Sequence, residues 1–121
     1  MNRKVSIAPM MDCTDRHERF FLRLISKNTL LYSEMIVSEA IHRGDKKRLL
    51  EFNINEKPIA LQIGGSSPKL LAEATKAGED FGYDEINLNL GCPSKKVEKN
   101  KFGACLMKEP NLVADCLSKM K

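Results

Sequence analysis

The sequence predicts an α/β domain of parallel strand–helix units, and three observations support this prediction. A short apolar run, a polar turn and a helical stretch follow one another four times along the 121 residues, at a spacing of roughly 25–30 residues. Hydrophobic residues make up 42% of the chain and charged residues 30%, which is typical of a globular protein. The sequence contains no low-complexity tract or linker, so we expect one domain.

The first unit is expected to be a strand over Val5–Met10 followed by a helix over about Asp15–Lys27. Thr14 precedes that helix and is its predicted N-cap. The helix carries an apolar stripe, made of Phe20, Phe21, Leu24 and Ile25. The second unit is a strand over Thr29–Val37, with helical residues continuing to about Phe52.

The third unit has the clearest helix start. A strand over Pro58–Gly65 precedes Ser67, a favoured N-cap residue, and Pro68 at the first helical position. The predicted buried stripe of this helix consists of Leu70, Leu71, Ala74 and Ala77. The Gly64–Gly65 pair lets a backbone approach a ligand or makes a turn, and we favour the turn.

The fourth unit is expected to be a strand over Asp84–Cys92, a longer loop, and a last helix that opens at Pro110. One face of that helix carries Leu112, Val113, Cys116, Leu117 and Met120. Four units fit half of a (β/α)8 barrel, which needs about 200–250 residues, or most of a doubly wound sheet. Because the chain stops at Lys121 at the end of a helix, we expect a single incomplete domain over residues 1–121.

Function in such folds lies at the carboxyl ends of the strands, and these ends carry residues able to bind or react. The amide of Gln62 donates and accepts at once, which matches an imide or a flavin edge, although a bond to a neighbouring loop is the alternative. Asn87 and Asn89 alternate along their strand and point to the same side, which favours a ligand role. Met10 and Met11 offer a polarisable surface for a ring.

Cys92 is the candidate reactive group. It follows a strand end and precedes Pro93, whereas the usual fate of a free cysteine is a buried apolar site of the kind expected for Cys116. A thiol with an ordinary pKa near 8.5 is mostly protonated at neutral pH and can act as a general acid. Alternatively, Lys95 and Lys96 could stabilise a nucleophilic thiolate. The residues alone leave both roles open.

The net charge of +4 is modest, but the basic residues form three clusters that would suit a polyanionic partner. The alternative is that they are solvated faces of ordinary helices. The clusters are Arg16, Arg19 and Arg23; Arg43, Lys46, Lys47 and Arg48; and Lys95, Lys96, Lys99 and Lys101.

The four cysteines and two histidines show no zinc-ligand spacing, so no metal is expected. The N-terminus lacks a secretory apolar region, which predicts reduced thiols and a cytoplasmic location. No apolar run approaches the roughly 18–20 residues of a membrane span, so no membrane partner is expected.

Five segments, in order and covering nearly the whole chain, together resemble the tRNA-dihydrouridine synthases, most closely their A-type branch. A G-C-P-S element alone would be weak, because related flavin barrels such as dihydroorotate dehydrogenases carry a similar N-x-x-C-P element. The segments are APMMDCTDRHERFFLR (Ala8–Arg23), LLYSEM (Leu30–Met35), PIALQIGGSSP (Pro58–Pro68), GYDEINLNLGCPS (Gly82–Ser94) and FGACLM (Phe102–Met107).

The resemblance implies an FMN-binding (β/α)8 barrel, of which this chain is the N-terminal half. It further implies that NADPH reduces the flavin, which passes a hydride to C6 of a D-loop uridine in tRNA while Cys92 donates a proton to C5. Asn89 matches a position that contacts the target nucleotide, and the basic clusters match tRNA-backbone contacts. Four positions match the family's flavin contacts: Pro9, Met10, Met11 and Gln62.

Two departures from the family pattern qualify this expectation. Cys13 stands where A-type members usually have Trp, which affects packing near the flavin more than the chemistry. The second half of the barrel and the helical tRNA-binding domain are expected to be absent, so the isolated chain is predicted to be inactive and to self-associate through open sheet edges. The alternatives are an FMN-dependent oxidoreductase of small pyrimidines and a non-catalytic half-barrel fragment.

Overall fold

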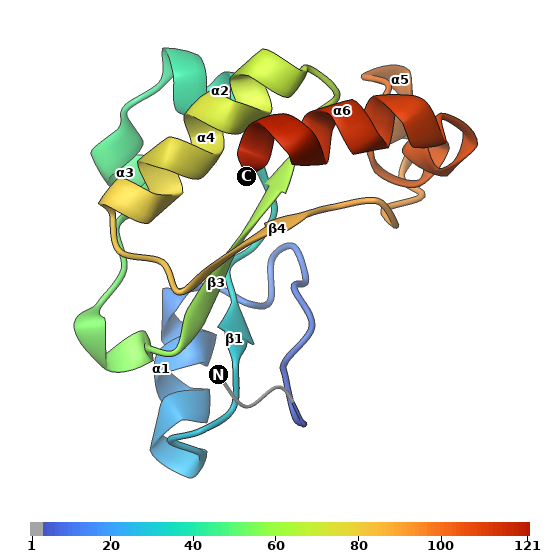
Figure 1. Ribbon diagram of the computed structural model, residues 1–121. Coiled ribbons are helices and arrows are strands. Elements are labelled where there is room, and N and C mark those ends of the chain that lie inside the picture. The colour runs from blue at the N-terminus through green and yellow to red at the C-terminus, as the bar shows by residue number, and fades with distance from the viewer. Residues whose placement is uncertain (1–3) are drawn as a thin grey trace.

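The computed structural model describes residues 4–121 and shows a parallel sheet with helices packed on it (Figure 1). The central strand β3 (Ile59–Gly64) pairs with β1 (Leu31–Tyr32), β2 (Ile36–Val37) and β4 (Glu85–Leu88), in each case in parallel. The predicted fold class, parallel strand–helix units that form part of a (β/α)8 barrel, is confirmed. Within the described residues no helix is both long and apolar enough to cross a membrane.

Three predicted strands are shorter than expected or interrupted, and the one predicted over Asp84–Cys92 ends at Leu88. β1 and β2 both lie along β3, so they are two pieces of the single strand predicted over Thr29–Val37, separated at Ser33–Met35. The strand predicted over Val5–Met10 is reduced to one parallel bridge between Ser6 and Leu30. Association through the open edges stays a prediction.

The helices follow the strands in the predicted order, but two regions differ from expectation. The second unit carries two short helices with a break, and the loop expected after Cys92 contains a helix. The helical elements are α1 (Arg16–Ile25), α2 (Ser38–Arg43), α3 (Lys46–Leu50), η1 (Ile54–Glu56), α4 (Pro68–Asp80), α5 (Lys95–Lys99), η2 (Gly103–Lys108) and α6 (Pro110–Met120).

Ser67 caps α4 as predicted, whereas the predicted Thr14 cap of α1 is wrong. The carboxylate of Asp15 accepts from the backbone N–H groups of His17 and Glu18, both at 2.9 Å. The bond from the Glu18 N–H is the main reason why the pKa of Asp15 lies below its ordinary value. The Thr14 hydroxyl instead bonds the backbone N–H and C=O of Met10, which fixes the preceding loop.

The main core lies between β3 and the helices α2, α4 and α6, and α4 and α6 pack side by side over the sheet (Figure 1). Gly78 lets α4 lie close to the sheet, because a Cβ at this position would lie 2.6 Å from Ile86 Cδ1 in β4 and 2.7 Å from Leu61 Cδ2 in β3. Cys116 is fully buried in this core, as predicted, and burial raises the pKa of its thiol. A second cluster joins Val97, Phe102 and Leu106.

The helix α1 lies apart from α4 and α6 and buries charge instead of its apolar stripe (Figure 1). The Arg19 guanidinium donates to the Glu56 carboxylate at 2.6 Å and to the Thr14 carbonyl at 2.7 Å. Arg23 donates to the carbonyls of Glu56 and Pro58. Burial lowers the pKa of Arg23. The first basic cluster is therefore not a free surface: two of its three arginines hold α1 onto η1.

Candidate functional site

The predicted amides lie together at the carboxyl ends of β3 and β4. Register pairs Gln62 with Asn87 across the two strands. The Gln62 side-chain N–H donates to Asn87 Oδ1 at 2.8 Å, and the Asn89 side-chain N–H donates to Gln62 Oε1 at 3.0 Å. Asn87 and Asn89 therefore do point to the same side, as the alternation predicts, and they bracket Gln62.

Asn89 connects these amides to Cys92. Its Oδ1 accepts from the backbone N–H of Cys92 at 2.9 Å and from that of Gly91 at 3.2 Å. This local bond closes the turn after the strand in the way that Asn side chains commonly do. Cys92 is half-buried, and its position four residues beyond the end of β4 is set by this turn.

The carbonyl of Cys92 is held from the other side by the start of η2. It accepts from the Ala104 backbone N–H at 3.0 Å. Gly103 has φ of 72°, and a Cβ there would lie 2.7 Å from the Cys92 carbonyl oxygen and 2.5 Å from Val97 Cγ1. Only glycine fits both the backbone conformation and the contact. Our sequence reasoning missed Gly103, although it lies in the FGACLM segment.

Cys92 and Met11, the latter from the first loop, both line a hollow of about 580 Å³. Pro9 and Met10 lie in the same loop but do not line this hollow. Met10 and Met11 are both exposed, at 56% and 55%. The lining residues are Met11, Met35, Val37, Glu39, Cys92, Ser94, Lys96, Val97, Asn100 and Phe102.

The loop that carries Met10 and Met11 (the methionine loop) is held in place by Glu34, to which we assigned no role, and by Thr14, which we predicted to be an N-cap. Glu34 Oε1 accepts from the Asp12 backbone N–H at 2.6 Å, and Asp12 has φ of 62°, a conformation that Asp adopts more readily than most residues. Thr14 closes the loop from its other end through Met10. Glu34 belongs to the LLYSEM segment, and this is the sequence feature that could have identified it as a functional residue.

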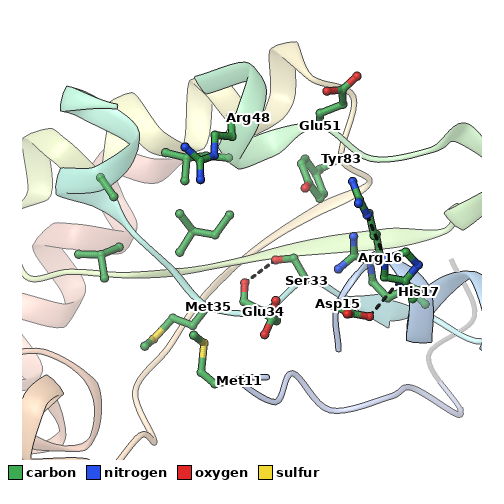
Figure 2. Close-up of a pocket in the computed structure, with 15 residues that line it drawn as sticks. Met11, Asp15, Arg16, His17, Ser33, Glu34, Met35, Arg48, Glu51 and Tyr83 are labelled. Atoms are coloured by element: carbon green, nitrogen blue, oxygen red, sulfur yellow. Dashed lines mark hydrogen bonds between the residues drawn. The ribbon is translucent and has the colours of Figure 1, made fainter. Parts of the chain in front are cut away.

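A second hollow of about 620 Å³ lies between α1 and the α2–α3 segment (Figure 2). Met11 and Met35 lie side by side at its edge and also line the first hollow, so they separate the two. Arg16 and Arg48 face it from opposite walls, together with Glu34 and Glu51. Its charge is mixed, because both arginines and carboxylates line it.

Gly64, predicted to make a turn with Gly65, has a different role. It is the last residue of β3 and is buried. A Cβ at this position would lie 2.8 Å from the Phe102 ring and 2.9 Å from Met35 Sδ. Gly64 therefore lets Phe102 and Met35 pack against the end of the strand, next to the hollow that holds Cys92.

All four cysteines are free, and Cys105 donates its S–H to the Phe102 carbonyl at 3.1 Å. Cys13 is exposed. Across residues 4–121 no group of three or more His, Cys, Asp or Glu side chains is placed to hold a metal ion.

The candidate site therefore has two parts. Cys92 and Met11 line the first hollow together with Glu39 and Lys96, whereas the three amides at the strand ends do not line it and are joined to Cys92 only through the Asn89 turn.

Parallel strand–helix units with amides and a thiol at the strand ends define an α/β protein whose site occupies the edge used by barrel enzymes. The family model described as "Dihydrouridine synthase (Dus)" matches residues 6–121. The chain belongs to this family.

Relatives of this chain carry the name tRNA-dihydrouridine(20/20a) synthase. The protein from Synechocystis sp. is 60% identical over 117 residues, which is 97% of this chain and 35% of the relative. That from Pseudomonas aeruginosa is 54% identical over 120 residues, or 99% of this chain and 36% of the relative. The protein from Xanthomonas campestris is 55% identical over 117 residues, which is 97% of this chain and 35% of the relative. The chain thus spans about a third of the length of these relatives.

Proposed function

We propose that this chain supplies part of the catalytic barrel of a tRNA-dihydrouridine synthase, an oxidoreductase that reduces a D-loop uridine. Its cofactor would be FMN, with NADPH as reductant, and its location would be the cytoplasm. The observation that carries the proposal is the fixed turn that presents Cys92 beside the methionine loop, in a chain that is 60% identical to a synthase of this name.

Cys92 is the proposed general acid. Saturating the C5=C6 bond of uracil requires a hydride at C6 and a proton at C5. In its protonated form, the thiol can donate its proton to C5 and recover one from solvent. Its backbone is bonded at both N–H and C=O, which would limit the positions that the thiol can take relative to a bound base.

The residues present fit the ring of a flavin. Met11 lines the hollow and Met10 precedes it in the same loop; both are exposed and would pack on the ring. The Gln62 side chain donates one hydrogen to Asn87 and accepts one hydrogen bond from Asn89. One donor hydrogen and one acceptor lone pair remain for the flavin edge. When bound, FMN reduced by NADPH would supply the hydride that adds at C6.

Asn89 would contact the target nucleotide through one atom only. Its Oδ1 is taken by the backbone N–H groups of Gly91 and Cys92, and one side-chain hydrogen by Gln62. The remaining hydrogen can donate to a uracil carbonyl. The uridine must leave its base stack to reach this position. All members of the three basic clusters except the buried Arg19 and Arg23 are exposed and available for tRNA phosphates.

A chimera tests the proposal. In it, this chain replaces the matching segment of the Synechocystis relative, and dihydrouridine in unmodified tRNA is measured by nucleoside mass spectrometry. Cys92→Ala should lower uridine reduction at least ~10²-fold, the usual contribution of a general acid, while flavin reduction by NADPH persists. Cys13→Ala, at an exposed cysteine, is the matched control and should retain activity. Full activity of the Cys92→Ala chimera would refute the assignment.

The 121-residue chain alone is proposed to bind FMN weakly or not at all and to have no turnover. A tight, yellow, stoichiometric flavin complex of the isolated chain would contradict this. In the chimera, NADPH oxidation stimulated by a free pyrimidine but not by unmodified tRNA would favour a small-molecule oxidoreductase instead.

A further inference from the structure

Three side-chain amides form one directed chain that ends at the backbone of Cys92. The order is Asn87, Gln62, Asn89 and then the Cys92 N–H, with donor–acceptor distances of 2.8, 3.0 and 2.9 Å. Asn87 lies farthest from the thiol and has no role in the function proposed above. Gln62, the middle member, is only 7% exposed.

The direction of this chain is dictated by the backbone. The N–H groups of Gly91 and Cys92 can only donate, so the oxygen of Asn89 must face them. The NH2 group of Asn89 then faces Gln62, which must present its oxygen. The NH2 group of Gln62 is consequently left facing position 87, where it requires an acceptor.

Asn87 therefore decides whether the orientation of Gln62 is stable. Without an acceptor at position 87, the NH2 group of Gln62 loses its partner on a side chain that is only 7% exposed. A flipped Gln62 would turn its NH2 group toward that of Asn89, placing donor against donor. Asn89 would then be free to rotate, and the bonds that close the Cys92 turn would weaken.

We propose that Asn87 is a positioning residue for Cys92, acting through Gln62 and Asn89. The role of Cys92 as a proton donor rests on the proposed function, whereas the effect of Asn87 on the position of Cys92 does not. The same bond sets which atoms of Gln62 remain free, so Asn87 also fixes the donor–acceptor pattern offered to a ligand ring.

Hydrogen exchange of the 121-residue chain, followed by NMR, tests the proposal. Asn87→Leu keeps the shape of the side chain and removes the acceptor, whereas Asn87→Asp keeps an acceptor. Asn87→Leu should speed exchange at the Gly91 and Cys92 amides about fivefold, the effect of one lost hydrogen bond. Asn87→Asp should restore the exchange rates of the unsubstituted chain.

The Leu71 amide in α4, bonded to the Ser67 carbonyl at 3.0 Å, is the internal reference and should not change in either variant. If Asn87→Leu loses that reference protection, Asn87→Ala takes its place, since it removes the acceptor and adds no bulk. Unchanged exchange at Cys92 in the acceptor-free variant, or equal acceleration in Asn87→Asp, overturns the proposal. The experiment involves no flavin and no tRNA, so its failure leaves the role of Cys92 as proton donor standing.

Discussion

The helix α4 buries its apolar stripe against the sheet, whereas α1 turns its own apolar stripe to solvent and buries two arginines. Leu71 and Ala74 of α4 are almost completely buried. On α1 the exposed fractions are 47% for Phe20, 60% for Phe21, 71% for Leu24 and 68% for Ile25. The first unit is thus fixed by directed hydrogen bonds and the third by packing, so the two should respond differently to the same kinds of substitution.

The largest effect is expected from Arg19→Met, which leaves the Glu56 carboxylate buried without its partner. Glu56 is 2% exposed, and loss of one member of a buried pair costs about 3–5 kcal/mol. Urea denaturation followed by circular dichroism measures the free energy of unfolding. Arg16→Met, at an exposed arginine of the same helix, should change it by less than about 0.5 kcal/mol. Equal losses for both variants would show that the buried pair does not hold α1.

The next largest effect is expected from replacing a leucine by alanine, and it should differ between α4 and α1. Leu71→Ala in α4 opens a cavity in the main core and should lower the free energy of unfolding by about 2–5 kcal/mol. Leu24→Ala in α1 removes an exposed side chain and should change it by less than about 0.5 kcal/mol. The same denaturation measurement applies to both. A large cost for Leu24→Ala would mean that the apolar stripe of α1 is covered in solution.

Tyr83 follows α4 and lies near the buried pair of α1, so its titration reports on the junction of the two regions. Burial is the main cause that raises the pKa of Tyr83 from 10.0 to about 12. The associated stability, about 3 kcal/mol, is fully present below pH 10 and is lost as pH rises through 12. Tyr83→Phe should remove this part of the alkaline fall in the free energy of unfolding, measured by urea denaturation at successive pH values. An identical fall in Tyr83→Phe would contradict the assignment.

The smallest effect on stability is expected from Phe21→Gln combined with Leu24→Gln. The free energy of unfolding should change by less than about 0.5 kcal/mol, because both side chains are already exposed. Fluorescence of the apolar dye anilinonaphthalene sulfonate should fall, since a contiguous exposed apolar face is removed. Lys69→Gln on the exposed side of α4 is the control and should leave the dye signal unchanged.

The third unit could be predicted almost residue by residue, because its signals are local. Ser67 and Pro68 mark the start of α4, and the observed strand Ile59–Gly64 falls within the predicted Pro58–Gly65. The burial of Arg19 could not be predicted, because its partner Glu56 lies 37 residues away and charged residues are expected at the surface.

The candidate site shows the same division. Gln62, Asn89 and Cys92 could be singled out from their places at strand ends, and Asn87 from its alternation with Asn89. Their linkage depends on the register that sets Gln62 opposite Asn87, which only the folded sheet fixes. Gly103 was missed for a similar reason, since the contact that requires glycine comes from Cys92 and Val97.

The bond from Ala104 to the Cys92 carbonyl has a consequence for engineering and for sequence divergence. This bond brings together the two ends of the loop formed by residues 93–102. The ends of the loop are therefore held together whatever the length of the loop. Lengthening such a loop costs little, about 0.6 kcal/mol for each doubling. Lys99 is exposed and does not line the hollow that holds Cys92, so it is a tolerant insertion point where a fluorescent or affinity tag can be placed without moving the thiol.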